Sequence, residues 1–305
     1  MPMSISSLLD FQDFSVEDLN DLFAQAFSLL SQNSDKNSNK NKIKFNELSL
    51  SSVSAGNRSG KVTDNRTVAL LFFEASTRTR FSFEMAAWRA GFYPTVFEAG
   101  AKTSLEKGES IQDTILNIAA MDPLALIIRC GDGVDLSAMQ KLTGLPLINA
   151  GWGVKGHPTQ ALLDMFTLQG RWGNDFRGKK LLFVGDVRFS RVVSSHLELA
   201  KKLGYEVAQC GPESFHRDIE IENDSVGNAN GYQLKKFSKL SEALAWADAV
   251  MALRFQFERH EGNQALAKNE YVDNFSLSRE SLKNLSPKAW IMHPGPINQG
   301  LEMQS

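Results

Sequence analysis

The chain has 305 residues, of which 42% are hydrophobic, enough to fill a core in each of two domains of ordinary size. Its 33 lysines and arginines are balanced by 35 aspartates and glutamates, and the formal charge is -2. This balance excludes the overall basic field that holds nucleic acid or anionic lipid. Any anion site must therefore be local.

The two cysteines, Cys130 and Cys210, lie far apart and form no CxxC pair, which argues against a disulfide framework or a cysteine zinc site. The first residues lack the charged start and apolar core of a signal peptide, and no run of about 18 apolar residues occurs. We therefore expect a soluble protein of the cytoplasm, a reducing compartment.

The chain is expected to open with a helix. Ser15 precedes Glu17 and Asp18 in the pattern of a capping box, and apolar residues recur at helical spacing at Leu19, Leu22, Phe23 and Phe27. The next segment, about residues 33–64, is rich in serine, asparagine and lysine and has no periodicity. We expect it to be a mobile polar insertion without chemistry.

From residue 67 onward, short apolar runs alternate with amphipathic stretches. The runs read as buried parallel strands and are VALLFFE, PTVFEA, ALIIR, PLINA, LLFVGD, EVAQCG, AVMALR and AWIMHPG. Helical patterns lie between them, at 108–121, 160–169 and 190–203. A polar, glycine-bearing stretch at 169–180 marks a boundary. We therefore predict an α/β protein of two Rossmann-like doubly wound domains with parallel sheets, residues 1–168 and 169–305.

In such sheets ligands bind beyond the carboxyl ends of the strands, so the residues after each apolar run are the first candidates. VALLFFE is followed by ASTRTR, where a helix is expected to begin at about Thr77. The free N–H groups of its first turn, with the nearby hydroxyls and the guanidinium of Arg78, would form an anion cradle. For this motif alone, a simple serine or threonine cap is the more ordinary interpretation.

The apolar residues Phe81, Met85 and Trp88 share one face of this expected helix. We interpret that face as the one that anchors the helix to the core. The motif would then place a cluster of anion-binding groups on a rigid support.

Arginine ends three further strands. Arg129 closes ALIIR, Arg191 lies in VRFSR after LLFVGD, and Arg254 follows AVMAL. Gln256 lies two residues beyond Arg254, on the same side of an extended segment. One such arginine would more often make a surface ion pair, but the repetition at equivalent positions indicates a shared anion site.

Two other strand ends carry candidate groups. His157 and Gln160 lie at the start of a helix, where a neutral imidazole can donate to a developing oxyanion. Pro294 and Gly295 lie in a rigid turn that can expose carbonyl groups as acceptors. Taken singly, the histidine also fits a capping or core residue, and the turn fits a simple strand end.

The sequence lacks the motifs GxxxxGK[ST], GxGxxG and HExxH, and it has no nucleophile elbow. Kinase-like, dinucleotide, zinc hydrolase and serine hydrolase functions therefore have no support. The candidates combine positive charge with neutral donors, which favours binding two small anions and stabilising an oxyanion between them. No protein nucleophile is needed. The loop KTSLEKGES, taken alone, reads as solvated.

The motifs FFEASTRTR, SLEKGES, HPTQALLDMFTL, VGDVRFSR, RFQFERH and HPGPINQG occur in this order over about residues 67–300. They resemble those of the catalytic chains of the aspartate carbamoyltransferase (aspartate transcarbamoylase) family. STRTR with HPTQ is specific to transcarbamoylases. RFQ and HPGP favour the aspartate member, because ornithine enzymes usually carry HCLP where this chain has HPGP.

The resemblance implies transfer of the carbamoyl group of carbamoyl phosphate to L-aspartate, an early step of de novo pyrimidine biosynthesis, in a crevice between the domains without metal or cofactor. It assigns carbamoyl phosphate binding to Ser76, Thr77, Arg78, Thr79, Arg129, His157, Gln160, Pro294 and Gly295. It assigns catalysis to Arg78, Thr79, Arg129, His157 and Gln160. It assigns aspartate binding to Arg191, Arg254 and Gln256.

The resemblance also implies a homotrimer with shared active sites, in which Ser104 and Lys107 reach into the site of a neighbouring subunit. A regulatory chain or a dihydroorotase partner is left open. The family normally continues for a few dozen residues after HPGP, with a helix that packs on the first domain, whereas this sequence continues only to residue 305. We expect exposed apolar surface on both domains there, and reduced stability.

Two other interpretations stay open. One is a transcarbamoylase for ornithine or acetylated ornithine, which would not need Arg254 for a side-chain carboxylate. The other is a non-catalytic relative that serves as a binding or assembly partner, which would require the loss of a motif residue. None is lost here.

Overall fold

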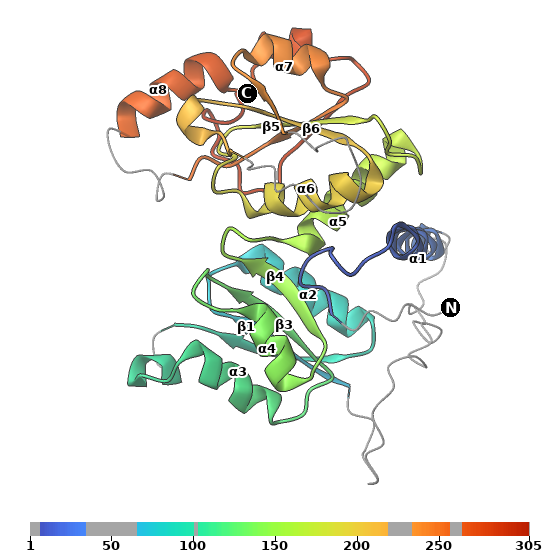
Figure 1. Ribbon diagram of the computed structural model, residues 1–305, viewed down its shortest axis with the longest axis vertical. Helices are drawn as coiled ribbons and strands as arrows, with labels where there is room; N and C mark the ends of the chain where they lie inside the picture. Colours follow the sequence, from blue (N-terminus) through green and yellow to red (C-terminus); the bar gives the residue numbers. More distant parts are fainter. Residues whose placement is uncertain (1–6, 35–65, 101–102, 219–233, 257–263, 305) are drawn as a thin grey trace, which may run out of the picture. The chain divides into compact units, whose positions relative to one another are not determined.

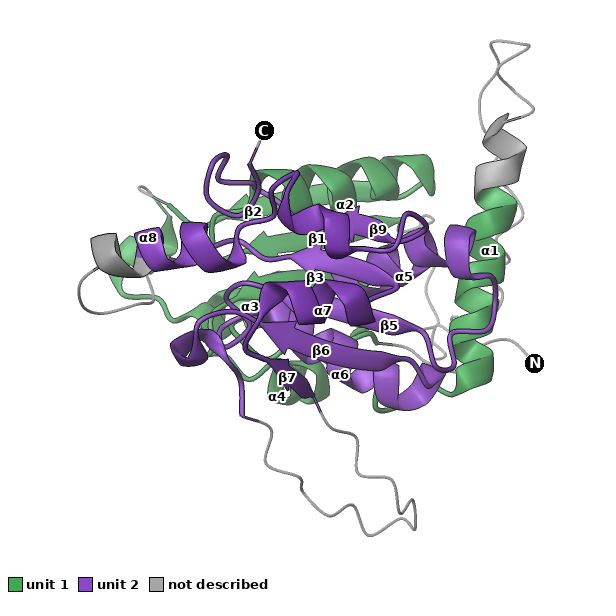
Figure 2. Cartoon of the chain, turned by 90° about the horizontal axis from the view of Figure 1, so that it is seen from above, with its two compact units in different colours: residues 1–159 green, residues 160–305 purple. Residues whose placement is uncertain are grey.

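The computed structural model describes residues 7–34, 66–100, 103–218, 234–256 and 264–304. The chain divides into two compact units, residues 1–159 and 160–305, and each contains one parallel sheet (Figure 2). The prediction of two α/β domains with parallel sheets is confirmed. The division of the units and the predicted division after residue 168 both lie within helix α5 (Pro158–Trp172).

Helix α1 (Val16–Ser34) begins at the predicted capping box. The Asp18 backbone N–H donates to Ser15 Oγ at 3.1 Å, and the Ser15 N–H donates to Asp18 Oδ2 at 2.9 Å. These reciprocal bonds satisfy the first donors of the helix, and the hydrogen bond from Ser15 lowers the pKa of the Asp18 carboxyl. The polar insertion lies outside the described residues except where α1 reaches into its start.

The sheet of unit 1 has four parallel strands in the order β2-β1-β3-β4. They are β1 (Thr67–Phe72), β2 (Tyr93–Glu98), β3 (Ala125–Cys130) and β4 (Leu147–Trp152). The helices of this unit's described part after α1 are α2 (Thr77–Arg89), η3 (Ser104–Lys107), α3 (Ile111–Ala119) and α4 (Leu136–Thr143) (Figure 1). Leu71 of β1 packs in a cluster with Ile115 of α3, and Leu70 packs in another with Ala87 of α2. Helices on both faces explain why the strands are apolar throughout.

Helix α2 does not use the apolar face that the sequence indicated. Phe81, Met85 and Trp88 are 50%, 47% and 52% exposed, so the expectation that they anchor the helix was wrong. Ala87 is buried instead, and Phe83 packs against the same core cluster. Residues four apart share a face, and α2 carries two such apolar faces. Spacing alone could not decide which of them turns inward.

The sheet of unit 2 has five parallel strands in the order β7-β6-β5-β8-β9. They are β5 (Lys180–Val184), β6 (Glu206–Cys210), β7 (Lys235–Phe237), β8 (Ala249–Ala252) and β9 (Trp290–Met292). Helix α6 (Arg191–Leu203) covers one face, and α7 (Leu240–Trp246) with α8 (Gln264–Phe275) covers the other (Figure 1). The short helices are η4 (Glu213–Phe215) and η6 (Ser281–Asn284).

All eight predicted strands are present. Strand β7 was missed because its sequence, KKF, is short, mostly exposed and without apolar alternation. Cys130 and Cys210 are buried and are not joined in a disulfide. Burial raises the pKa of Cys210 to about 12. Within the described ranges, none of the helices has the length and apolar character needed to span a bilayer.

Candidate active site

In each sheet, the chain reverses its direction of strand addition at one point. In unit 1 this switch point lies between β1 and β3, and in unit 2 between β5 and β8. Ligands of open α/β sheets bind outside the carboxyl ends of the strands at such points. STRTR and Arg129 lie at the first switch point, and Arg191 and Arg254 follow the two strands of the second. We call Ser76, Thr77, Arg78, Thr79, Arg129 and His157 the unit 1 site, and Arg191, Arg254 and Gln256 the unit 2 site.

The STRTR motif begins α2 at the carboxyl end of β1. Phe72 pairs with Arg129 across β1 and β3, so the motif starts beside the end of β3 as well. Thr77 is the first helical residue, as predicted, and Ser76 is the cap position. The Ser76 side chain makes no capping hydrogen bond. Its hydroxyl and the N–H groups of the first turn therefore remain available to an anion, which is not what a simple cap would leave.

The two arginines of STRTR differ in their surroundings. Arg80 lies 3.3 Å from Glu84 and 3.5 Å from Glu98, and its guanidinium stacks on the Phe81 ring at 4.3 Å. Arg78 is exposed and forms neither an ion pair nor a hydrogen bond within the part of the chain that the structure describes. Arg80 is thus committed to the fold, and Arg78 can bind a ligand.

Arg129 is a nearly buried cation at the end of β3, only 9% exposed. Its Nη1 donates to the Ala150 carbonyl of β4 at 3.4 Å, and its Nε lies 3.8 Å from Glu74 Oε2 in the turn before STRTR. These contacts fix the guanidinium between the ends of three strands. A guanidinium stays charged at every physiological pH, so this position favours an anion.

His157 follows the turn that ends β4 and is 8% exposed. Its Nδ1 lies 3.3 Å from Thr159 Oγ1. When that hydroxyl donates to Nδ1, the proton of the neutral ring is on Nε2, which can then donate to an oxyanion. The ends of β1, β3 and β4 thereby bring the six residues of the unit 1 site to one edge of the sheet.

Ser104 and Lys107 bound the short helix η3, which ends at Gly108 with φ of 93°. The Ser104 hydroxyl bonds to Glu109, and this hydrogen bond lowers the pKa of that carboxyl. Asn117 also donates to Glu109, at 2.9 Å. The turn is therefore held by its own polar contacts, while Lys107 is exposed.

The unit 2 site is built on adjacent strand ends. Val184 of β5 pairs with Ala252 of β8, and the Leu253 N–H donates to the Val184 carbonyl at 2.8 Å. Gly185 has φ of 118°, and a Cβ there would lie 2.9 Å from the Leu253 carbonyl oxygen. Only glycine permits this close approach. The loop that leads to Arg191, the first residue of α6, and the loop that carries Arg254 thus leave the sheet side by side.

Sequence reasoning missed Arg217, which fixes the loop before α6. Its Nη1 donates to Ser194 Oγ at 2.7 Å, and its Nη2 donates to the carbonyls of Arg188 at 3.1 Å and Ser190 at 3.0 Å. Burial lowers the pKa of Arg217. These bonds restrain the backbone of residues 188–190, which directly precede Arg191. Nothing in the sequence near residue 217 indicates such long-range contacts.

Glu302 was also missed. It joins the loop that follows β8 to the loop that follows β9. This buried carboxylate accepts from the Phe255 N–H at 2.8 Å and from the N–H and side-chain amide of Asn298 at 2.6 and 2.7 Å. Phe255 lies between Arg254 and Gln256, and Asn298 follows the HPGPI turn. Glu302 therefore ties the RFQ loop to the loop after Pro294 and Gly295.

Open α/β sheets bind ligands outside the carboxyl ends of the strands at their switch points, and arginines lie there in both units of this chain. Comparison with known protein families identifies the family. The model described as "Aspartate/ornithine carbamoyltransferase, carbamoyl-P binding domain" matches residues 6–170, and that described as "Aspartate/ornithine carbamoyltransferase, Asp/Orn binding domain" matches residues 177–305. The chain belongs to the aspartate/ornithine carbamoyltransferase family.

Among curated proteins, the aspartate carbamoyltransferase catalytic subunit of Chlorobium phaeovibrioides is 40% identical over 241 residues, 79% of this chain and 74% of that protein. The same subunit of Prosthecochloris aestuarii is 42% identical over 238 residues, 78% and 73% of the two chains. A crystal structure of aspartate transcarbamoylase from Trypanosoma cruzi with carbamoyl aspartate and phosphate has a TM-score of 0.76 at 24% identity, covering 98% of this chain and 86% of that one.

Ornithine carbamoyltransferase from Thermus thermophilus has a TM-score of 0.74 at 21% identity, covering 98% of this chain and 88% of that one. Aspartate and ornithine enzymes thus share the fold, and the fold alone does not select the acceptor. The more similar sequences are aspartate enzymes.

Proposed function

We propose that this protein transfers the carbamoyl group of carbamoyl phosphate to the amino group of L-aspartate, giving N-carbamoyl-L-aspartate and phosphate, an early step of de novo pyrimidine biosynthesis. The observation that carries the proposal is the placement of cationic side chains at both switch points. It is supported by relatives of about 40% identity that are aspartate carbamoyltransferase catalytic subunits.

The unit 1 site would hold the phosphate. The hydroxyls of Ser76, Thr77 and Thr79 and the N–H groups at the start of α2 supply neutral donors. Arg78 would add a bidentate fork, and the nearly buried Arg129 would span the phosphate and the carbonyl oxygen. This arrangement fits a small dianion that carries a reactive acyl group.

Catalysis would rest on positioning and on donors aimed at the carbonyl oxygen. The aspartate amine attacks the carbamoyl carbon, and His157, Thr79 and Arg78 stabilise the tetrahedral oxyanion. The C–O bond to phosphate then breaks, phosphate takes the electron pair, and it accepts the proton that the amine loses. Gln160 and the carbonyls of Pro294 and Gly295 would orient the carbamoyl amino group. Holding two reactants in line contributes roughly 7–11 kcal/mol of barrier lowering.

The unit 2 site would hold aspartate. Arg191 and Arg254 would bind its two carboxylates, assisted by Gln256. An acceptor with an amine in its side chain, such as ornithine, gives Arg254 nothing to pair with. Two arginines that follow the neighbouring strands β5 and β8 therefore favour the dicarboxylate.

Turnover with separate acceptors tests the proposal. Purified protein mixed with carbamoyl phosphate should release phosphate with L-aspartate and not with L-ornithine or N-acetyl-L-ornithine, as measured by a colorimetric phosphate assay. Release with an ornithine acceptor alone would identify the other branch of the family. Absence of release with every acceptor would favour a non-catalytic binding role.

We propose further that the active form is a homotrimer in which Ser104 and Lys107 enter a neighbour's site. The exposed ammonium of Lys107 could serve that role. Helix α2 supports self-association, because Phe81, Met85 and Trp88 leave an apolar face about half exposed. Single exposed apolar residues are ordinary, but three on one helix face support the proposal of a surface for a partner.

Met85→Glu should weaken the trimer, because it places a charge in the centre of that apolar face. Sedimentation velocity at micromolar concentration should give the wild type about three times the 33.8 kDa chain mass and the variant a smaller particle with lower activity. Met121→Glu is the matched control, since Met121 is 76% exposed and outside α2. A wild-type monomer, or a trimeric Met85→Glu variant, would contradict the assignment.

The setting of the enzyme is also proposed. Buried thiols at Cys130 and Cys210 support a reducing compartment, the cytoplasm. The relatives are named catalytic subunits, which supports association with a further chain, either a regulatory chain or a dihydroorotase. The reaction as written requires no metal or cofactor. We also propose that the boundary between the two domains follows residue 168.

A further inference from the structure

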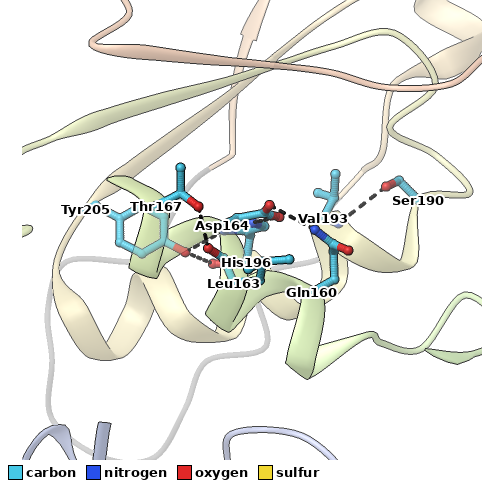
Figure 3. A network of polar contacts seen from close by, with 8 residues as sticks. All are labelled: Gln160, Leu163, Asp164, Thr167, Ser190, Val193, His196 and Tyr205. Carbon is cyan, nitrogen blue, oxygen red and sulfur yellow. Dashed lines mark hydrogen bonds and ion pairs between the residues drawn. The ribbon is translucent and has the colours of Figure 1, made fainter. Parts of the chain in front are cut away.

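A chain of four polar side chains runs through unit 2 from Gln160 in the first turn of α5 to Tyr205, two residues after the end of α6 (Figure 3). Gln160 Nε2 donates to Asp164 Oδ1 at 3.0 Å. Asp164 Oδ2 lies 3.2 Å from His196 Nε2. His196 Nδ1 lies 3.0 Å from the Tyr205 hydroxyl, which donates to the His196 carbonyl at 2.9 Å.

All but one of these residues are buried. Asp164, His196 and Tyr205 are 4%, 0% and 1% exposed, whereas Gln160 is half-buried. The His196 ring also lies against Phe183 of β5, with ring centroids 5.3 Å apart. Buried polar groups are rigid when every member is bonded, and costly otherwise. The network therefore ends at a single accessible group, the amide of Gln160.

The hydrogen-bond directions can be assigned from the single proton of Tyr205. That proton goes to the His196 carbonyl, so the hydroxyl oxygen accepts from His196 Nδ1, which must carry a hydrogen. The contact between Nε2 and Asp164 Oδ2 then contains one proton, either on an imidazolium or on a neutral carboxyl. Both arrangements leave Asp164 Oδ1 as an acceptor.

This acceptor determines which way the Gln160 amide faces. Only the NH2 group of Gln160 can donate to Asp164 Oδ1, so the carbonyl Oε1 is directed away from Asp164. An outward carbonyl accepts hydrogen bonds, and a carbamoyl amino group donates them. A reversed amide would place two donors face to face.

We propose that Asp164 and His196 are positioning residues that hold Gln160 Oε1 toward the carbamoyl amino group, and so set the preference for a carbamoyl over an acetyl donor. Acetyl phosphate is the informative probe, because a methyl group replaces the amino group. The amine of aspartate would attack its acyl carbon, form N-acetylaspartate and release phosphate, which accepts the amine proton. This inference rests on the proposed function.

The measured quantity is the ratio of kcat/KM for carbamoyl phosphate to kcat/KM for acetyl phosphate, with aspartate saturating. In His196→Phe the Asp164 carboxyl loses the partner that orients it, so it no longer holds the Gln160 NH2 group in one place and the amide can turn. The ratio should fall about tenfold, the size of one lost hydrogen bond. If a thermal melting curve shows that His196→Phe does not fold, His196→Leu is used in its place. It also removes both ring nitrogens, and its side chain is smaller.

Asp164→Asn should keep the preference for carbamoyl phosphate over acetyl phosphate that Asp164→Leu loses. The Nε2 of a neutral His196 accepts, so the amide introduced by Asp164→Asn must turn its NH2 to the ring and its oxygen to Gln160. The ratio should stay within about twofold of wild type in Asp164→Asn and fall about tenfold in Asp164→Leu. Thr167→Val is a matched control on α5, since Thr167 bonds only to the Leu163 carbonyl at 2.9 Å among the described residues.

A double-mutant cycle tests whether the effect passes through Gln160. In a Gln160→Leu background, His196→Phe should leave the ratio unchanged. An equal fall in both backgrounds, or no fall in either, overturns the inference while the proposed function stands. A wild-type protein inactive with carbamoyl phosphate and aspartate overturns both.

Discussion

Replacing Arg78 by methionine is expected to lower kcat/KM for carbamoyl phosphate by about a thousandfold. Two charge-assisted hydrogen bonds from a guanidinium contribute about 1.5–3 kcal/mol each, and each 1.4 kcal/mol is a factor of ten. Arg78 has no ion-pair or hydrogen-bond partner within the described residues, so the loss should appear in activity. Initial rates of phosphate release at saturating aspartate measure it.

Arg80→Met is the matched control, because it removes the same charge two residues away. Arg80 pairs with Glu84 and Glu98 and stacks on Phe81. Its loss should lower the melting temperature by a few degrees, since these ion pairs are partly buried, and leave kcat/KM within a few-fold of wild type. Equal losses of activity in the two variants would mean that the motif acts as a structural cap.

The strands could be predicted because parallel strands are buried on both faces and therefore read as continuous apolar runs. The same logic selected the candidate site residues. STRTR, Arg129 and Arg254 end or closely follow apolar runs, Arg191 follows the loop after β5, and parallel strands direct their carboxyl ends to one edge of a sheet. Strand β7 was missed because three mostly exposed residues carry no such signal.

Two kinds of feature could not be predicted from the sequence. One is which apolar face of a helix is buried, and the other is which residues far apart in the sequence make contact. Helix α2 has apolar residues on two faces, and only packing against β1 and β2 determines that Ala87 turns inward. The pair Gln160 and Asp164 could be inferred, since residues four apart on a helix are neighbours. The contact of Asp164 with His196 joins separate helices across 32 positions, and no local pattern indicates it.

Replacing Arg254 by methionine is expected to raise the KM for aspartate by about a hundredfold or more and to lower kcat. The reason is that a carboxylate loses a guanidinium that would bind it with charge-assisted hydrogen bonds. Glu302 fixes the backbone next to Arg254 through the Phe255 N–H, at 2.8 Å, so the loop should keep its place in the variant. Steady-state kinetics with aspartate as the varied substrate measure the change.

Changing the substrate and the protein together shows which carboxylate of aspartate Arg254 binds. L-Asparagine lacks the side-chain charge, so wild type should strongly prefer aspartate, and Arg254→Met should lose most of that preference. Arg188→Met removes an arginine of the neighbouring loop that is exposed and stacks on Phe189, and it should retain the preference. If Arg254→Met discriminates aspartate from asparagine as well as wild type does, the side-chain carboxylate binds elsewhere, and the argument against an ornithine acceptor loses its main residue.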